Sequence, residues 1–105
     1  MKLLVAIINN DDIKALTKNL VKNKIYSTKL SSTGGFLSSG NTTLLIGCAD
    51  DDVERILEII KENAKERKKV VPPTFSQTIG YYAPVEVVVG GATVFVLDVE
   101  QFHKL

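Results

Sequence analysis

Residues 3–23 have the sequence LLVAIINNDDIKALTKNLVKN, which contains the signals for a buried strand followed by an amphipathic helix. The continuous apolar run at residues 3–8 predicts a strand that is central in a sheet or covered on both faces. Asn9 and Asn10 are favourable N-cap residues, and the two aspartates that follow suit the positive end of a helix dipole. The helix then carries one apolar stripe and ends near Asn23. That stripe consists of Ile13, Leu16 and Leu20.

The same pattern returns from Leu44 onward. Residues 44–48 predict a second apolar strand, and the aspartates at 50–52 predict the start of a second helix. The apolar stripe of this helix consists of Val53, Ile56, Leu57, Ile60 and Ala64. Basic residues at 65–69 complement the negative end of its dipole. Residues 25–32 and 85–89 predict the strand that follows each helix.

Two strand–helix–strand units predict an α+β, ferredoxin-like βαββαβ fold, with both helices on one face of an antiparallel sheet. Gly90 and Gly91 separate two β-branched runs and predict a tight hairpin turn. Residues 92–97 would then form an extra C-terminal β-strand, and residues 99–105 a closing helical turn. The chain of 105 residues is expected to be a single domain, residues 1–105.

Composition narrows the class of protein. The sequence is 45% apolar and 24% charged, with a net charge of +1, which argues against a nucleic-acid footprint. The single cysteine excludes an internal disulfide and favours a cytoplasmic protein. The basic and apolar start at residues 1–8 lacks a cleavage site and predicts a strand rather than a signal peptide. No apolar run is long enough to span a membrane.

Side chains for catalysis or metal binding are sparse. His103 is the only histidine, and no spacing of His, Cys, Asp or Glu resembles a metal site. Cys48 ends an apolar strand and is expected to be a small core residue. Ser38 and Ser39 have no base arranged near them in the sequence, and neither the motif G-x-x-x-x-G-K-[ST] nor the motif G-x-G-x-x-G is present. We therefore expect a protein that is not an enzyme and that needs no cofactor.

Two predicted loops, and the face of the predicted sheet that the helices leave uncovered, are candidate sites for binding. Residues 33–40 form a short glycine-rich loop, whereas residues 66–82 form a long loop before the strand at 85–89. Long loops in small domains are usually functional. The strands at 3–8 and 85–89 hardly alternate between polar and apolar residues, which predicts that a partner covers the open face of the sheet. Self-association into a closed ring is the simplest such partner.

The glycine-rich loop has the parts of a nucleotide site. Gly34 and Gly35 expose backbone N–H groups to phosphate oxygens, and Phe36 offers a ring face to a purine. Asn41 carries the donor and the acceptor that match an adenine edge, and the Thr28 hydroxyl suits a phosphate oxygen. The alternative is a hairpin turn whose phenylalanine packs on the core, with Asn41 as an ordinary turn residue.

Several motifs, in order, resemble one family. They are Thr28-Lys29-Leu30, Thr33-Gly34-Gly35-Phe36-Leu37, Gly40-Asn41-Thr42-Thr43, Gly47 and the closing segment PVEVVVGGATVFVLDVEQFHKL. Together they look like the signature of the PII-like cyclic di-AMP receptors. The resemblance implies a homotrimer of ferredoxin-like subunits that binds cyclic di-AMP in clefts between neighbours, without enzyme activity.

The resemblance also implies residue roles. Thr28 would contact phosphate, Asn41 would bind the adenine, and the Gly47 backbone would meet the base. Gly35, Phe36 and Leu37 would form the pocket wall. An arginine that family members often carry is replaced here by Tyr26, which can stack on a base, and a second is replaced by Ser38. Lys24 or Lys29 can supply the missing positive charge.

Two other functions stay open at this point. A PII-like trimer that lacks those arginines can bind ATP, ADP or another anion instead. Alternatively, the protein is an interaction module whose loop at residues 66–82 docks an unknown protein partner. Pro72, Pro73, Phe75, Tyr81 and Tyr82 would then make the contact.

Overall fold

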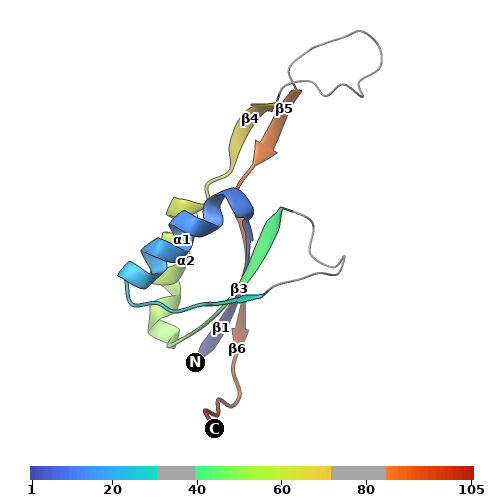
Figure 1. Cartoon of the computed structure of the whole chain (residues 1–105). Helices are drawn as coiled ribbons and strands as arrows, with labels where there is room; N and C mark the ends of the chain where they lie inside the picture. The colour runs from blue at the N-terminus through green and yellow to red at the C-terminus, as the bar shows by residue number, and fades with distance from the viewer. Residues whose placement is uncertain (31–39, 72–84) are drawn as a thin grey trace.

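The computed structural model describes residues 1–30, 40–71 and 85–105 (Figure 1). In chain order, the elements are β1 (Lys2–Asn9), α1 (Asn10–Lys22), β2 (Thr28–Leu30), β3 (Asn41–Cys48), the 3-10 turn η1 (Asp50–Asp52), α2 (Val53–Asn63), β4 (Arg67–Val71), β5 (Val85–Val89) and β6 (Ala92–Asp98).

Four strands form an antiparallel sheet in the order β2-β3-β1-β6, and both helices cover one of its faces (Figure 1). The core lies between these two layers. In β1, Leu4, Ala6 and Ile8 are fully buried against the helices, as alternate residues of a strand must be. Leu16 and Leu20 of α1 belong to the same buried cluster as these three side chains. The ferredoxin-like fold and the apolar stripes of both helices are therefore confirmed.

Local chemistry accounts for the start of α1. The side chain of Asn9 accepts a hydrogen bond from the Asp11 N–H at 2.8 Å, so it is the expected N-cap. The acidic run at 50–52 instead forms η1, a short turn directly before α2. The start of each helix is acidic, as the dipole favours.

The strand that completes the sheet differs from the prediction. β5 pairs with β4, with Arg67 opposite Val89 and Val71 opposite Val85, and these two strands form a separate sheet. β6 takes the place beside β1, so it is the fourth strand of the ferredoxin-like sheet rather than an addition to it. The prediction of a hairpin at Gly90-Gly91 is wrong. Both glycines do have positive φ, of 83° and 77°, but they connect two sheets.

The two-stranded sheet β4–β5, called the ribbon below, projects from the body of the protein (Figure 1). The expected loop at residues 66–82 thus begins with a strand, because the basic residues at 67–69 pair with β5 instead of extending the end of α2. Residues 72–82 of that loop lie outside the described residues, and so do residues 33–39 of the short loop.

Other boundaries differ as well, and β3 begins at Asn41 instead of at Leu44. Residues 25–27 precede β2 in irregular backbone, so this strand is shorter than expected at its start. Residues 99–105 have irregular backbone and not the expected helical turn. The Val99 N–H bonds to the Met1 carbonyl at 3.2 Å, which continues the pairing with β1 and holds the chain extended at that point.

Candidate functional site

The face of the sheet opposite the helices carries the candidate site. Leu3, Val5 and Ile7 of β1 point to this face and are only partly buried. Phe95 lies opposite Val5 and Leu97 opposite Leu3, and these two side chains remain 53% and 48% exposed. This face, called the open face below, is therefore apolar and largely uncovered in a single subunit.

β2 brings Thr28 to the open face. Thr28 pairs with Leu45, which alternates with the buried residues Leu44 and Ile46, so both side chains point away from the helices. Lys29 pairs with Leu44 and belongs to the helical face. The two neighbours therefore lie on opposite sides of the sheet. Tyr26, just before the strand, is 73% exposed, so its ring is accessible.

Asn41 and Gly47 lie at opposite ends of β3 on this same face. Asn41 pairs with Asn9 and Gly47 pairs with Leu3. Six residues at about 3.3 Å each separate them by about 20 Å, which is far more than the width of one base. A single adenine cannot contact both positions in one subunit. They would have to contact different bases.

Hydrogen bonds fix the backbone around Asn41. The Asn10 N–H donates to the Gly40 carbonyl at 2.7 Å, and the Thr42 hydroxyl donates to the Asn10 side-chain oxygen at 2.5 Å. Gly40 has a φ of 98°, which a residue with a side chain rarely adopts. The first residue of α1 therefore holds the residues on both sides of Asn41.

The other predicted residues divide into two groups. Gly47 is exposed, and a Cβ atom there would meet only the Met1 Cε atom at 3.6 Å, so its backbone is open to approach. Gly35, Phe36 and Leu37 lie outside the described residues, as does Ser38.

Two residues of the open face were missed by the sequence analysis. Phe95 is an exposed aromatic side chain on β6. The alternation of side chains along residues 92–98 would have assigned Phe95 to the open face, had the pairing of this strand with β1 been known. Thr43 is 3% exposed, and within the described parts of the chain its hydroxyl has no hydrogen-bond partner. Buried hydroxyls are usually paired, so Thr43 is an unusual polar group beneath this face.

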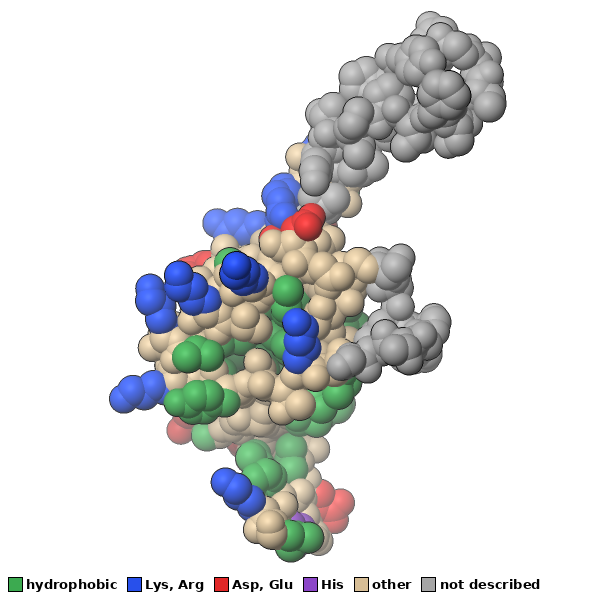
Figure 2. All heavy atoms as spheres, in the orientation of Figure 1, with side chains coloured by type: hydrophobic (Ala, Val, Ile, Leu, Met, Phe, Trp, Pro, Cys, Tyr) green, Lys and Arg blue, Asp and Glu red, His purple; other side chains and the backbone are tan. Residues whose placement is uncertain are grey.

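A polar pocket lies where the ribbon leaves the body. Its volume is about 220 Å³, and its lining includes Ile7, Asn41, Glu66, Gly91, Ala92 and Thr93. We call it the junction pocket. Figure 2 shows acidic surface in this region, at the base of the ribbon, with basic side chains close by. A larger hollow of about 510 Å³ lies between α2 and β6, on the helical side of the sheet.

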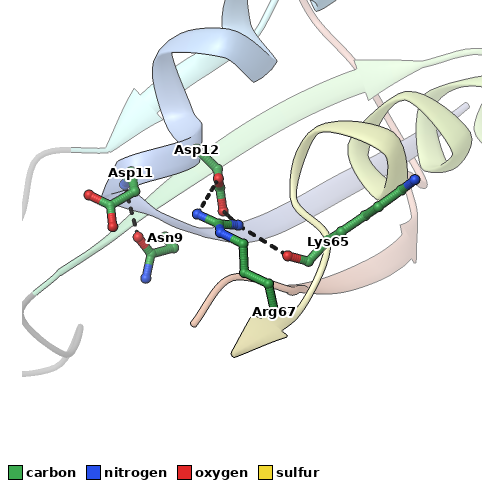
Figure 3. Close-up of polar contacts among 5 residues, drawn as sticks. All are labelled: Asn9, Asp11, Asp12, Lys65 and Arg67. Atoms are coloured by element: carbon green, nitrogen blue, oxygen red, sulfur yellow. Dashed lines mark hydrogen bonds and ion pairs between the residues drawn. The ribbon is translucent and has the colours of Figure 1, made fainter. Parts of the chain in front are cut away.

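Arg67 joins the ribbon to the body beside the junction pocket. Figure 3 shows its guanidinium between the Asp12 carboxylate and the Lys65 carbonyl, to which Nη1 donates at 3.1 Å. The first turn of α1 and the end of α2 are thereby linked through one side chain.

The described residues offer no group of three or more potential metal ligands. His103 lies 3.0 Å from the Gln101 side-chain oxygen, near the end of the chain. Cys48 is buried, and burial raises the pKa of its thiol, so the reactive thiolate is disfavoured. Among the described helices, none is long and apolar enough to cross a membrane.

Comparison with known proteins assigns the family. The model of a family described as "Cyclic-di-AMP receptor" matches residues 1–105. Among solved structures, the chain is similar to a functionally unknown protein from Pediococcus pentosaceus ATCC 25745. The two share 41% sequence identity with a TM-score of 0.76, over 99% of this chain and 96% of that one. The sequence motifs, the ferredoxin-like fold and the whole-chain match agree, and the protein belongs to the cyclic-di-AMP receptor family.

Proposed function

We propose that this protein is a cytoplasmic, non-enzymatic signal-transduction receptor. It binds cyclic di-AMP in clefts between the subunits of a PII-like homotrimer. The observation that carries the proposal is the match of the receptor family to the whole chain, residues 1–105.

The open face supports association into a trimer. Exposed apolar side chains such as Phe95 and Leu97 are unfavourable in water, and a patch of this kind usually marks a contact surface. Covering it with further copies of the chain removes this apolar area from water. A closed ring satisfies each copy equally and leaves no open end.

The positions of the candidate residues favour a ligand that spans subunits. Thr28 donates to a phosphate oxygen, and Asn41 binds an adenine edge through its amide. Gly47, about 20 Å from Asn41, meets a different base. Gly35, Phe36 and Leu37 form the wall of the cleft. Tyr26 adds a stacking ring, whereas Lys29 belongs to the helical face and is not part of this site. A dinucleotide with two bases, held between neighbouring copies of this face, uses both ends of β3.

Isothermal titration calorimetry tests this function. We expect cyclic di-AMP to bind with one ligand per subunit, and more tightly than cyclic di-GMP or ATP. Thr28→Val removes the hydroxyl and keeps the shape, so the affinity should fall about tenfold or more, the effect of one hydrogen bond to a charged group. Thr17→Val on α1 makes the same chemical change on the helical side and should leave the affinity unchanged.

Absence of adenine-nucleotide binding below high micromolar concentrations would contradict the proposal. Tighter binding of ATP or ADP than of the cyclic dinucleotide would favour the alternative, a PII-like trimer for another anionic ligand. The loss of two arginines at the positions of Tyr26 and Ser38 motivates that alternative.

The projecting ribbon favours one additional role. β4 and β5 extend away from the sheet that carries the candidate site, and strands with unpaired edges are ready-made contacts for another chain. We propose that a protein partner docks on this part of the molecule, residues 66–82. Deletion of residues 72–84 should abolish partner binding while cyclic di-AMP still binds. Interactions that survive the deletion would exclude this role.

A further inference from the structure

Among the described residues that line the junction pocket, Glu66 is the one with a carboxylate. It follows α2 directly and lines the pocket together with Asn41 and Thr93. Over residues 1–30, 40–71 and 85–105, no hydrogen bond or ion pair engages its side chain, which is exposed. A charged acceptor is thus available beside a residue of the proposed nucleotide site.

The surrounding backbone holds Glu66 in place. A Cβ atom on Gly91 would lie 3.6 Å from Glu66 Cβ and 3.9 Å from Oε2, so the side chain rests against this glycine. On one side of Glu66, the Lys65 carbonyl accepts a hydrogen bond from Arg67; on the other, Arg67 is paired with Asp12. Contacts of both neighbours of Glu66 therefore hold its backbone beside the junction pocket.

The two polar side chains of the pocket differ in what they can distinguish. The Asn41 amide has both a donor and an acceptor, so by turning over it can bind an amino group or a carbonyl group of a base. An ionised carboxylate only accepts hydrogen bonds. Adenine has a 6-amino group where hypoxanthine and guanine have a carbonyl oxygen. A carboxylate facing this position accepts from the amino group and repels the carbonyl.

We infer that Glu66 determines the preference for adenine by accepting a hydrogen bond from the 6-amino group of a base that Asn41 also binds. This inference rests on the proposed function. The junction pocket, at about 220 Å³, is smaller than the roughly 300–1,000 Å³ of a site for a whole drug-sized ligand, so it holds one end of a dinucleotide. The anionic phosphates would lie toward Thr28, which pairs with Leu45, four positions along β3 from Asn41.

The test compares cyclic di-AMP with cyclic di-IMP, whose bases carry a carbonyl oxygen at the 6-position and no 2-amino group. Calorimetry gives the ratio of the two affinities for the wild-type protein and for Glu66→Gln. The glutamine has the same shape but can both donate and accept, so it suits either base. We expect the ratio to fall about 10- to 100-fold. Glu62→Gln, the same change on the exposed side of α2, should keep the wild-type ratio.

The outcomes separate this inference from the proposed function. If the wild-type protein prefers cyclic di-AMP and Glu66→Gln keeps that preference while remaining folded, the role of Glu66 is excluded and the receptor function stands. Equal wild-type affinity for the two dinucleotides leads to the same conclusion. If the wild-type protein binds no cyclic di-AMP, the receptor function and the role of Glu66 fall together. Thermal unfolding of both variants shows whether they are folded.

Discussion

Arg67 contacts the Asp12 carboxylate through both terminal nitrogens of its guanidinium group. Nη2 lies 3.0 Å from Oδ1, and Nη1 lies 3.3 Å from Oδ2, in the forked geometry that favours arginine over lysine. The Asp12 side chain is 9% exposed and that of Arg67 is 44% exposed. The base of the ribbon is thus attached to the first turn of α1 by a pair whose carboxylate is nearly out of reach of water.

Replacing Arg67 should destabilise the protein. Arg67→Gln leaves the buried Asp12 carboxylate without its cation, and we expect a loss of about 1–3 kcal/mol in the free energy of unfolding. Lys68→Gln removes one positive charge from the next residue, which is exposed, and should change the stability by less than about 0.5 kcal/mol. Urea unfolding at a fixed protein concentration measures both. Equal effects would show that the pairing with Asp12 contributes nothing.

Three glycines should respond differently to alanine. Gly90 has a φ of 83°, and its Cβ would lie 2.4 Å from the Lys65 carbonyl oxygen, so Gly90→Ala adds a clash to backbone strain. Gly40 has a φ of 98° but nothing within 4 Å, so Gly40→Ala should cost only the strain, about 1–2 kcal/mol. Gly47→Ala meets neither problem and should be nearly neutral. Thermal unfolding should rank the three losses of stability in this order. A Gly90→Ala variant as stable as Gly47→Ala would contradict the close approach of Gly90 to the Lys65 carbonyl.

The open face can be tested with one charge. Phe95→Lys places an ammonium group among Val5 and its apolar neighbours, where burial of an unpaired charge is costly, so we expect the oligomer to dissociate. Val21→Lys on α1 changes a side chain of similar exposure, 58%, on the helical side, and should leave the assembly intact. Sedimentation velocity reads the mass directly. A Phe95→Lys protein with the mass of the wild type would place the contact between subunits elsewhere.

Cys48 provides a prediction on pH. Burial raises the pKa of its thiol, and the carboxylates of Asp52 and Asp50 raise it further. An acid whose pKa rises on folding makes folding less favourable once the pH exceeds its unfolded value, so stability should decline as the pH rises above about 8.5. Cys48→Ala should lack this part of the decline. Reaction with a disulfide reagent at pH 7.5 should be slow in the native protein and fast in urea. Equal rates would show that the thiol is exposed.

The sequence was sufficient for the body of the fold. The runs at Leu3 and Leu44, each followed by an acidic helix start and a helical stripe, predicted β1, α1, β3 and α2, because burial of one helix face leaves a clear period. These local patterns each involve residues close in the chain. They also predicted which side of each helix faces the sheet.

Local sequence patterns could not predict which strands pair when those strands are far apart in the chain. Residues 85–89 are β-branched and suit any neighbouring strand, and two glycines permit a hairpin and a crossing between sheets equally well. The true partner, β4, contains the basic residues 67–69, which resembled the end of a helix. The same limitation explains why Phe95 was missed, since its place follows from register. The separation of Asn41 from Gly47 was not foreseen because the strand predicted at residues 44–48 in fact begins at Asn41.

The narrow attachment of the ribbon makes it a lever. Its strands leave the body through Lys65–Glu66 on one side and Gly90–Gly91 on the other. Five residues at about 3.4 Å each place the far ends of β4 and β5 about 17 Å from this pivot. A rotation of about 10° at the glycines therefore swings those ends through about 3 Å, an amplification that a strand embedded in the main sheet does not have.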